Sequence, residues 1–217
     1  MDPAARDLPE RPPGCVGAGH RRLDRLTASG ATIAHCPAVF VRNGEALDSF
    51  GKYQSAGINL GLGTDTWPPD LLHNMQLGVY VGRLMGKSPT AVTMADLFNA
   101  ATLGGARALG RDDLGRLAPG AQADIVIFDL NAPHLGPIFD PLKNLFLAGR
   151  GTDCRASYIA GRRVMEDFTV AGADMSALQA QAERQFGKLL ENQRQRRFDD
   201  AGAKPVVVPV FPWVEGE

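Results

Sequence analysis

Two side chains capable of acid–base and metal-binding chemistry follow two short apolar segments. Asp65 comes directly after the run INLGLGT, and His35 ends the run ATIAH. An aspartate in this position could ligate a divalent metal ion, or act as a base toward a water molecule bound to that metal. The alternative is an aspartate that caps the following turn or helix, and the residue types alone leave both interpretations open.

The two apolar segments are predicted to be neighbouring parallel strands, because each is short and each is followed by a helical pattern. Residues just past the carboxyl ends of parallel barrel strands face one common mouth, so we expect His35 and Asp65 to open onto the same face. A lone histidine at a strand end is more often structural than catalytic. Two such residues on consecutive strands favour a shared site.

The other reactive side chains favour structural roles. His73 falls within a helical pattern, which favours a packed or solvent-facing side chain, and His134 falls in a loop. Cys36 has no basic neighbour except His35, so we expect a small core residue and not a thiolate nucleophile. The glycine-rich runs GLGTDT and LGGARALG lack phosphate-loop spacing and a following Lys-Ser/Thr pair, which argues against a nucleotide site.

The elements that must position these side chains alternate between helix and strand. After Gly110 the pattern changes to a small β module over about 115–170, with Gly161 in the turn of a predicted hairpin. A polar amphipathic helix and a proline-broken, apolar arm follow it. The predicted helices cover residues 20–30, 44–57, 70–86, 93–110 and 175–198, and the predicted strands cover 31–36, 58–63 and 124–130.

Composition narrows the class of protein. The chain has 217 residues, is 44% hydrophobic and carries a formal net charge of −1, which gives no support for nucleic acid or an anionic membrane surface as the main partner. No apolar run approaches the roughly 20 residues that a membrane-spanning helix needs. Three cysteines without CxxC spacing argue against a disulfide framework, and the first residues lack the apolar core of a signal peptide. We therefore expect a cytoplasmic protein.

Five segments occur in an order that resembles the C-terminal part of the metal-dependent amidohydrolase superfamily. They are SGATIAHCPAVFVRNG, AGINLGLGTDT, MADLFNAATLGGARALG, DDLGRLAPGAQADIVIFDL and YIAGRRV. The similarity is greatest to the chlorohydrolase and deaminase branch, which includes cytosine, guanine and triazine aminohydrolases. The resemblance implies an α/β fold, with the last two strands and following helices of a (β/α)8 TIM-type barrel, part of a flanking β-sandwich and a C-terminal helix.

The same resemblance implies boundaries and site residues. It divides the chain into a lead-in (1–19), a partial barrel (20–112), a sandwich part (113–172) and a C-terminal helix with an extended tail (173–217). Asp65 falls on the family's strand-eight aspartate, which binds the metal or its attacking water and passes the proton to the leaving group. His35 falls on the family's HCP histidine near the substrate, and Trp67 would lie on the loop over the substrate. The implied reaction is metal-dependent hydrolysis of a non-peptide C–N or C–Cl bond, such as deamination of a small heterocyclic amine, with zinc or else iron as the divalent metal.

The chain departs from the family pattern in its metal ligands. The paired histidines of the first barrel strand are absent, since none of the four histidines are paired. His20 is the one candidate for an upstream metal ligand, although the stretch between it and ASGAT is shorter than in related sequences. A catalytic zinc site normally has about three protein ligands. The alternative is therefore a truncated, inactive remnant or interaction module without metal, which could form a homo-oligomer through an open strand edge or its C-terminal segment.

Overall fold

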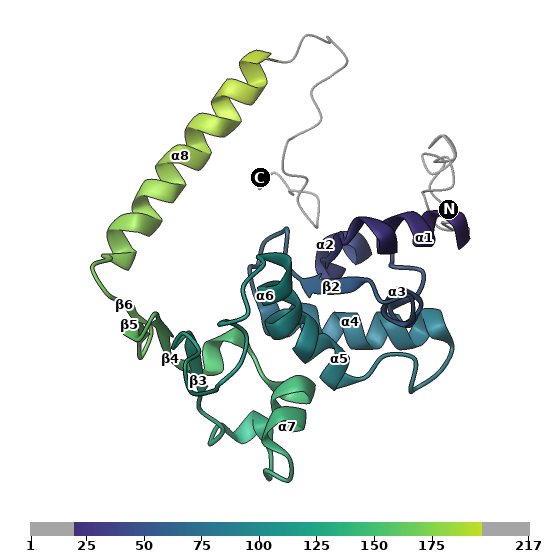
Figure 1. Cartoon of the computed structure of the whole chain (residues 1–217). Coiled ribbons are helices and arrows are strands. Elements are labelled where there is room, and N and C mark those ends of the chain that lie inside the picture. The colour runs from purple at the N-terminus through teal and green to yellow at the C-terminus, as the bar shows by residue number, and fades with distance from the viewer. Residues whose placement is uncertain (1–19, 197–217) are drawn as a thin grey trace. The chain divides into compact units, whose positions relative to one another are not determined.

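The computed structural model describes the chain from His20 to Arg196, with side chains described from Leu23 to Asn192 (Figure 1). The chain divides into two compact units, Met1–Phe168 and Thr169–Glu217. The predicted lead-in of residues 1–19 and the predicted apolar arm at the other end lie outside the described residues. None of the helices between His20 and Arg196 combines the length and the hydropathy that crossing a membrane requires.

Two parallel strands form the centre of the first half of the chain. Strand β1 (Thr32–His35) pairs with β2 (Asn59–Leu62), in a register that places His35 opposite Leu62. The prediction of neighbouring parallel strands is therefore confirmed. In the described part of the chain β2 is the only strand beside β1, so the other edge of β1 carries no strand.

Short helices connect the two strands. Helix α1 (His20–Ser29) precedes β1, and helices α2 (Pro37–Arg42) and α3 (Phe50–Ser55) lie between β1 and β2. The sequence pattern does not predict α2, because a proline after an apolar run also suits the end of a strand. Proline is equally suited to the first turn of a helix, where its missing N–H has no intrahelical partner, and this is where the structure places it.

Two longer helical segments follow β2 and match the predicted ones. Helix α4 (Leu71–Gly86) begins at the N-cap Asp70. Helix α5 (Met94–Asn99) continues through a π-helical turn (Ala100–Gly104) into α6 (Gly105–Ala108), and the predicted capping pair Thr93–Asp96 forms a complete capping box.

The π-helical turn is where the helical segment touches the parallel strands. A Cβ atom on Gly104 would lie 2.0 Å from the carbonyl oxygen of Leu60, so only glycine permits this approach to β2. The side chain of Asn59 donates to the carbonyl of Gly104 at 2.9 Å. A π-helical turn widens the helix locally, and here it accompanies a backbone-to-backbone contact with the strand that leads to Asp65.

The hydrophobic core forms between these strands and helices. Its buried members come from β2, from the helices α3, α4 and α5, from the segment before α5 and from residues 141–148, which ties β2 to the helices packed around it. They include Phe50, Leu60, Val79, Val92, Leu97 and Phe146.

The chain after α6 forms the predicted β module. Strand β3 (Ile125–Phe128) pairs antiparallel with β4 (Cys154–Ile159), which in turn pairs antiparallel with β5 (Arg162–Glu166). The turn of the predicted hairpin has positive φ at both Ala160 and Gly161, the geometry that suits a tight two-residue connection. Helix α7 (Pro141–Ala148), with a 3-10 turn on each side of it (Pro133–Leu135 and Gly151–Asp153), is inserted between β3 and β4 and was not predicted.

The second unit is described only in part. It contains the short strand β6 (Thr169–Val170) and helix α8 (Met175–Arg196), which Figure 1 shows as one uninterrupted helix. The start of α8 agrees with the helix predicted from Met175 onward, and the last residues of that prediction lie outside the described part.

Candidate functional site

Asp65 lies in an exposed position three residues beyond the end of β2. Its backbone adopts φ +47°, a left-handed conformation that non-glycine residues seldom take, although aspartate takes it more readily than most. Among the described residues, no hydrogen bond or ion pair reaches its carboxylate. The cap of the following helix is instead Asp70, which accepts from the backbone N–H of His73 at 3.1 Å. The helix-capping alternative therefore applies to Asp70 and not to Asp65.

His35 is buried at the end of β1, with 7% of its surface exposed. Its ring packs against the ring of Phe50, with centroids 5.9 Å apart and planes inclined by 60°. Its backbone carbonyl accepts from the N–H of Gly63 at 3.0 Å, which extends the pairing of the two strands by one step. Burial lowers the pKa of His35 from 6.5 to about 4, because the charged imidazolium is poorly solvated there. At neutral pH the ring is therefore uncharged, and can donate or accept a hydrogen bond.

The ends of the two strands lie close enough that the charge of Asp65 affects the thiol of Cys36, the residue after His35. The pKa of the Cys36 thiol is raised, first by burial and then by the negative charge of Asp65, against a smaller opposing effect of a hydrogen bond with the Gly63 backbone. Cys36 is buried, as predicted for a small core residue, and its raised pKa disfavours the thiolate form. The carboxyl ends of β1 and β2 thus lie side by side, whereas a common opening for the side chains of His35 and Asp65 stays a prediction, and the described residues show no direct contact between them.

Hydrogen bonds from Arg42, the last residue of helix α2, hold the loop after Asp65 in place. The guanidinium of Arg42 donates to the hydroxyl of Thr66 at 2.9 Å and to the carbonyl of Trp67 at 2.6 Å. The Trp67–Pro68 peptide bond is cis. The Trp67 side chain is 79% exposed, so its aromatic face is available to another group. Sequence analysis did not identify Arg42, whose partners lie more than twenty residues away.

A buried asparagine joins the two loops that follow the strands. Asn74 on α4 has no exposed surface; its Oδ1 accepts from the N–H of Ala38 at 3.1 Å and its Nδ2 donates to the carbonyl of Asp70 at 3.0 Å. The carboxylate of Asp70 also accepts from the N–H of Gly151 at 3.0 Å. Sequence analysis missed Asn74, and the signal that points to it is a polar amide within the apolar stripe LLHNMQL.

The remaining histidines within the described side chains occupy structural positions. His73 is exposed on α4, which agrees with the solvent-facing alternative. His134 lies with Nε2 3.0 Å from Oδ2 of the buried Asp153, and the same oxygen accepts from the N–H of Arg150 at 2.8 Å. This pair connects two loops of the β module.

A complete metal site does not form among the side chains described here. No group of three or more His, Cys, Asp and Glu residues within the described part is arranged to hold an ion. Asp65 is available as one oxygen ligand, whereas the side chain of His20 lies outside the described side chains. Because a catalytic zinc site takes about three protein ligands, the described residues by themselves do not fit a catalytic zinc ion.

Comparison with known proteins gives consistent matches over most of the chain. Residues 17–164 match the family model described as Amidohydrolase family. A protein of Natronomonas pharaonis named 5-methylthioadenosine/S-adenosylhomocysteine deaminase is 36% identical over 179 residues, which cover 81% of this chain and 41% of that protein. The chain thus spans about two fifths of the length of this curated relative.

Solved structures show the same partial coverage. An adenosine deaminase from Xanthomonas campestris with bound zinc superposes with a TM-score of 0.75 at 27% identity, over 80% of this chain and 40% of that one. An atrazine chlorohydrolase from Arthrobacter aurescens complexed with zinc superposes with a TM-score of 0.71 at 26% identity, over 78% and 39%.

Proposed function

Because the chain belongs to the amidohydrolase family, we propose that it supplies one side of the active site of a hydrolase that cleaves non-peptide C–N bonds. Deamination of a small heterocyclic amine is the reaction that we favour, since two similar curated proteins are named 5-methylthioadenosine/S-adenosylhomocysteine deaminase. C–Cl hydrolysis, as the name of one structural neighbour indicates for that protein, is the related alternative. The observation that carries the proposal is Asp65, exposed beyond β2 and without a hydrogen-bond partner among the described residues.

We propose that β1 and β2 correspond to the last two strands of a (β/α)8 barrel. On this proposal residues 20–112 form the partial barrel, residues 113–172 the sandwich part, and residues 173–217 a C-terminal helix and tail. The parallel pairing of β1 with β2 and the antiparallel pairing of β3 to β5 support this division. Structural similarity to the adenosine deaminase from Xanthomonas campestris over 80% of this chain supports it as well.

Asp65 is the proposed catalytic residue. A carboxylate that no protein donor occupies can accept a proton from an attacking water molecule and pass it to the leaving nitrogen. Its position past a strand end matches where the catalytic side chains of barrel enzymes lie. We therefore assign the catalytic role to Asp65 and the helix-capping role to Asp70, five residues later.

His35 and Trp67 are the proposed substrate contacts. The neutral imidazole of His35 can exchange a hydrogen bond with a ring nitrogen or an exocyclic group of the substrate without bringing a charge into a buried position. The exposed ring of Trp67 can cover the face of a heterocycle, because aromatic rings pack in offset or edge-to-face arrangements.

A divalent metal, zinc or alternatively iron, is part of the proposal. Asp65 is the proposed ligand from the described residues, and His20 remains a candidate whose side chain lies outside them. The further ligands that a catalytic metal needs would come from residues beyond the described part, or from another polypeptide. The similar adenosine deaminase and chlorohydrolase were solved with zinc, which supports zinc as the first choice.

A non-catalytic interaction module is the second candidate function. It is favoured by the lack of a metal-binding group among the described residues and by the free edge of β1 within the same part. Unpaired strand edges tend to pair with another chain, so this candidate predicts self-association through β1 or the C-terminal segment.

Measuring metal content and ammonia release on the full purified chain tests the first proposal. The assay offers 5-methylthioadenosine and S-adenosylhomocysteine and compares the unmodified chain with Asp65→Asn. The matched control is Asp24→Asn, an exposed aspartate on α1 that also loses one charge. Activity and bound metal that are lost only in Asp65→Asn support the proposal. A metal-free chain without activity contradicts it for this chain, and self-association in solution would then favour the second candidate.

A further inference from the structure

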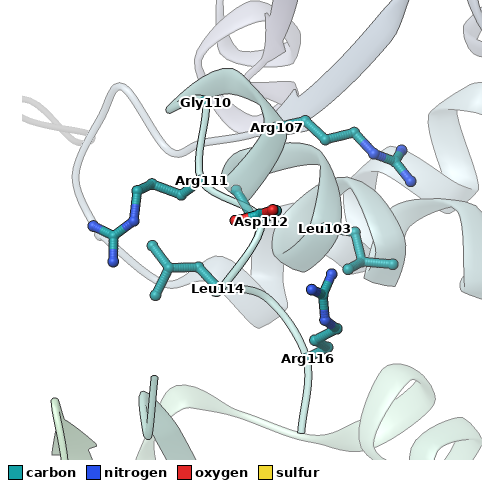
Figure 2. Close-up of a pocket in the computed structure, with 8 residues that line it drawn as sticks. Leu103, Arg107, Gly110, Arg111, Asp112, Leu114 and Arg116 are labelled. Carbon is teal, nitrogen blue, oxygen red and sulfur yellow. The ribbon is translucent and has the colours of Figure 1, made fainter. Parts of the chain in front are cut away.

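A pocket of about 440 Å³ lies where α6 ends and the chain turns toward β3 (Figure 2). Its lining shares no residue with the site around Asp65, His35 and Trp67, so the proposed function leaves it unexplained. The side chains that give it a chemical character are three arginines, one carboxylate and two leucines. They are Arg107, Arg111, Arg116, Asp112, Leu103 and Leu114.

Two of the three arginines are not neutralised by a contact. Arg111 donates from Nε and Nη2 to the two oxygens of Asp113, each at 2.6 Å, and Nη2 also donates to Gln122 at 2.9 Å. Within the described part of the chain, neither Arg107 nor Arg116 has an ion pair or a side-chain hydrogen bond. The charge of Arg116 acts on Asp113 only at a distance: the pKa of that carboxyl lies below its ordinary value mainly because of Arg111.

The loop that carries these side chains is held in place by its backbone. Gly110 takes φ +65°, and the N–H of Arg111 donates to the carbonyl of Ala106 at 2.9 Å, which closes the helix end. Gly115 takes φ +75° and lies so close to Thr102 that a Cβ atom would be 2.7 Å from its carbonyl oxygen. The pocket therefore has a defined wall on the loop side, before any ligand is present.

The arrangement of charges and apolar groups fits an anionic ligand with an apolar body. Figure 2 shows the guanidinium of Arg116 directed toward Leu103, with Arg107 projecting on the same side of the pocket, whereas Arg111 and Leu114 lie on the other side. Guanidinium groups bind phosphate and carboxylate oxygens in a fork, and such charge-assisted hydrogen bonds are stronger than neutral ones. The volume is within the range of small-molecule sites.

We propose that this pocket binds a small organic anion, whose phosphate or carboxylate group is held by Arg107 and Arg116 and whose apolar part lies against Leu103. The ion pair of Arg111 with Asp113 keeps the loop in position and is not itself the anion contact. Asp112, the single carboxylate in the lining, adds a negative charge that disfavours highly charged polyanions.

Titration of the full chain with phenyl phosphate, benzoate and inorganic phosphate, followed by amide chemical shifts, tests the proposal. We expect saturable shifts for residues 103–116 with phenyl phosphate or benzoate, and weaker binding of inorganic phosphate, which lacks an apolar body. The comparison of phenyl phosphate with benzoate identifies the preferred anionic group. Arg107→Gln and Arg116→Gln are each expected to weaken binding by about 3- to 10-fold, the loss of one charge-assisted contact at an exposed site.

The matched control is Arg162→Gln on β5, an exposed arginine that removes the same charge far from the pocket in sequence. It should leave the dissociation constant unchanged, and thermal unfolding checks that all variants fold. An equal loss in Arg162→Gln would reduce the effect to general electrostatics and overturn the proposal. Saturable binding that neither pocket variant weakens, or the absence of binding to both organic anions, would also overturn it.

Discussion

Replacing Asn74 by alanine should destabilise the chain far more than replacing its exposed neighbour on the same helix. Asn74 is completely buried and makes two hydrogen bonds, from the Ala38 N–H and to the Asp70 carbonyl. In Asn74→Ala the Ala38 N–H loses its acceptor at the buried start of α2, whereas the Asp70 carbonyl loses one of its two bonds and keeps the one from the backbone N–H of residue 74. Asn74 thereby connects the segment after His35 with the start of the helix that follows the Trp67 loop.

The magnitude follows from the two lost hydrogen bonds. A typical hydrogen bond contributes about 1 kcal/mol net, and a buried group left without a partner costs about 1–3 kcal/mol. The unpaired Ala38 N–H and the one bond lost at the Asp70 carbonyl together predict a loss of about 2–4 kcal/mol, a large fraction of the roughly 5–15 kcal/mol by which domains are stable. Asn74→Asp keeps the acceptor for Ala38 but loses the donor and buries a carboxylate, so it should also destabilise.

Urea denaturation of the full chain measures this effect, with His73→Ala as the control. His73 is exposed on the same turn of α4, and its backbone N–H, the one bonded to Asp70, is kept in the variant. We expect His73→Ala to change the free energy of unfolding by less than about 0.5 kcal/mol. A loss in Asn74→Ala no larger than that in His73→Ala would refute the reasoning.

Two further predictions concern the strands. The pKa of His35 is about 4 in the folded chain and 6.5 ordinarily, so the unfolded chain binds more protons between these two pH values. The free energy of unfolding should therefore fall by up to about 3 kcal/mol as the pH drops from 6.5 toward 4. Urea midpoints measured against pH should lose most of this slope in His35→Gln, and an unchanged slope would contradict the assignment. Gly104→Ala should cost at least about 2 kcal/mol in the same assay, since its Cβ would lie 2.0 Å from the Leu60 carbonyl, whereas Gly105→Ala, which meets open space, should not destabilise.

The features that sequence analysis predicted correctly depend on short-range patterns. Each of the strands β1 and β2, the Thr93–Asp96 capping box and the Gly161 turn is encoded within a few consecutive residues. The prediction failed where one residue type serves two purposes: Pro37 can end a strand or begin a helix, and the structure shows that it begins α2. Helix α7 was missed since it interrupts an otherwise regular β module.

The site was predictable as far as strand register determines it. That His35 and Asp65 share an edge follows from the alternation of strands and helices, without any long-range information. The contacts of Asn74 and Arg42 were not predictable, because they join residues 36 and 24 positions apart, and Gly104 acquires its role only where α5 and α6 meet β2. Local patterns thus located the candidate side chains, and long-range packing determines what surrounds them.

The loop that follows β2 lies between two aspartates, Asp65 and Asp70, and is constrained at both ends. Asp70 is fixed by two backbone donors, one in its own helix and one at Gly151, and the bond of Asn74 to its carbonyl adds a third link. Among the residues that the structure describes, nothing bonds to the Asp65 side chain, and its backbone adopts a left-handed conformation that costs of order 1 kcal/mol for a residue with a side chain. An unfavourable conformation persists when the surrounding structure determines it, and here the strand pairing on one side and Arg42 on the other provide that constraint. The carboxylate of Asp65 is consequently presented to an external group, as our proposal that it is the proton-transfer residue requires.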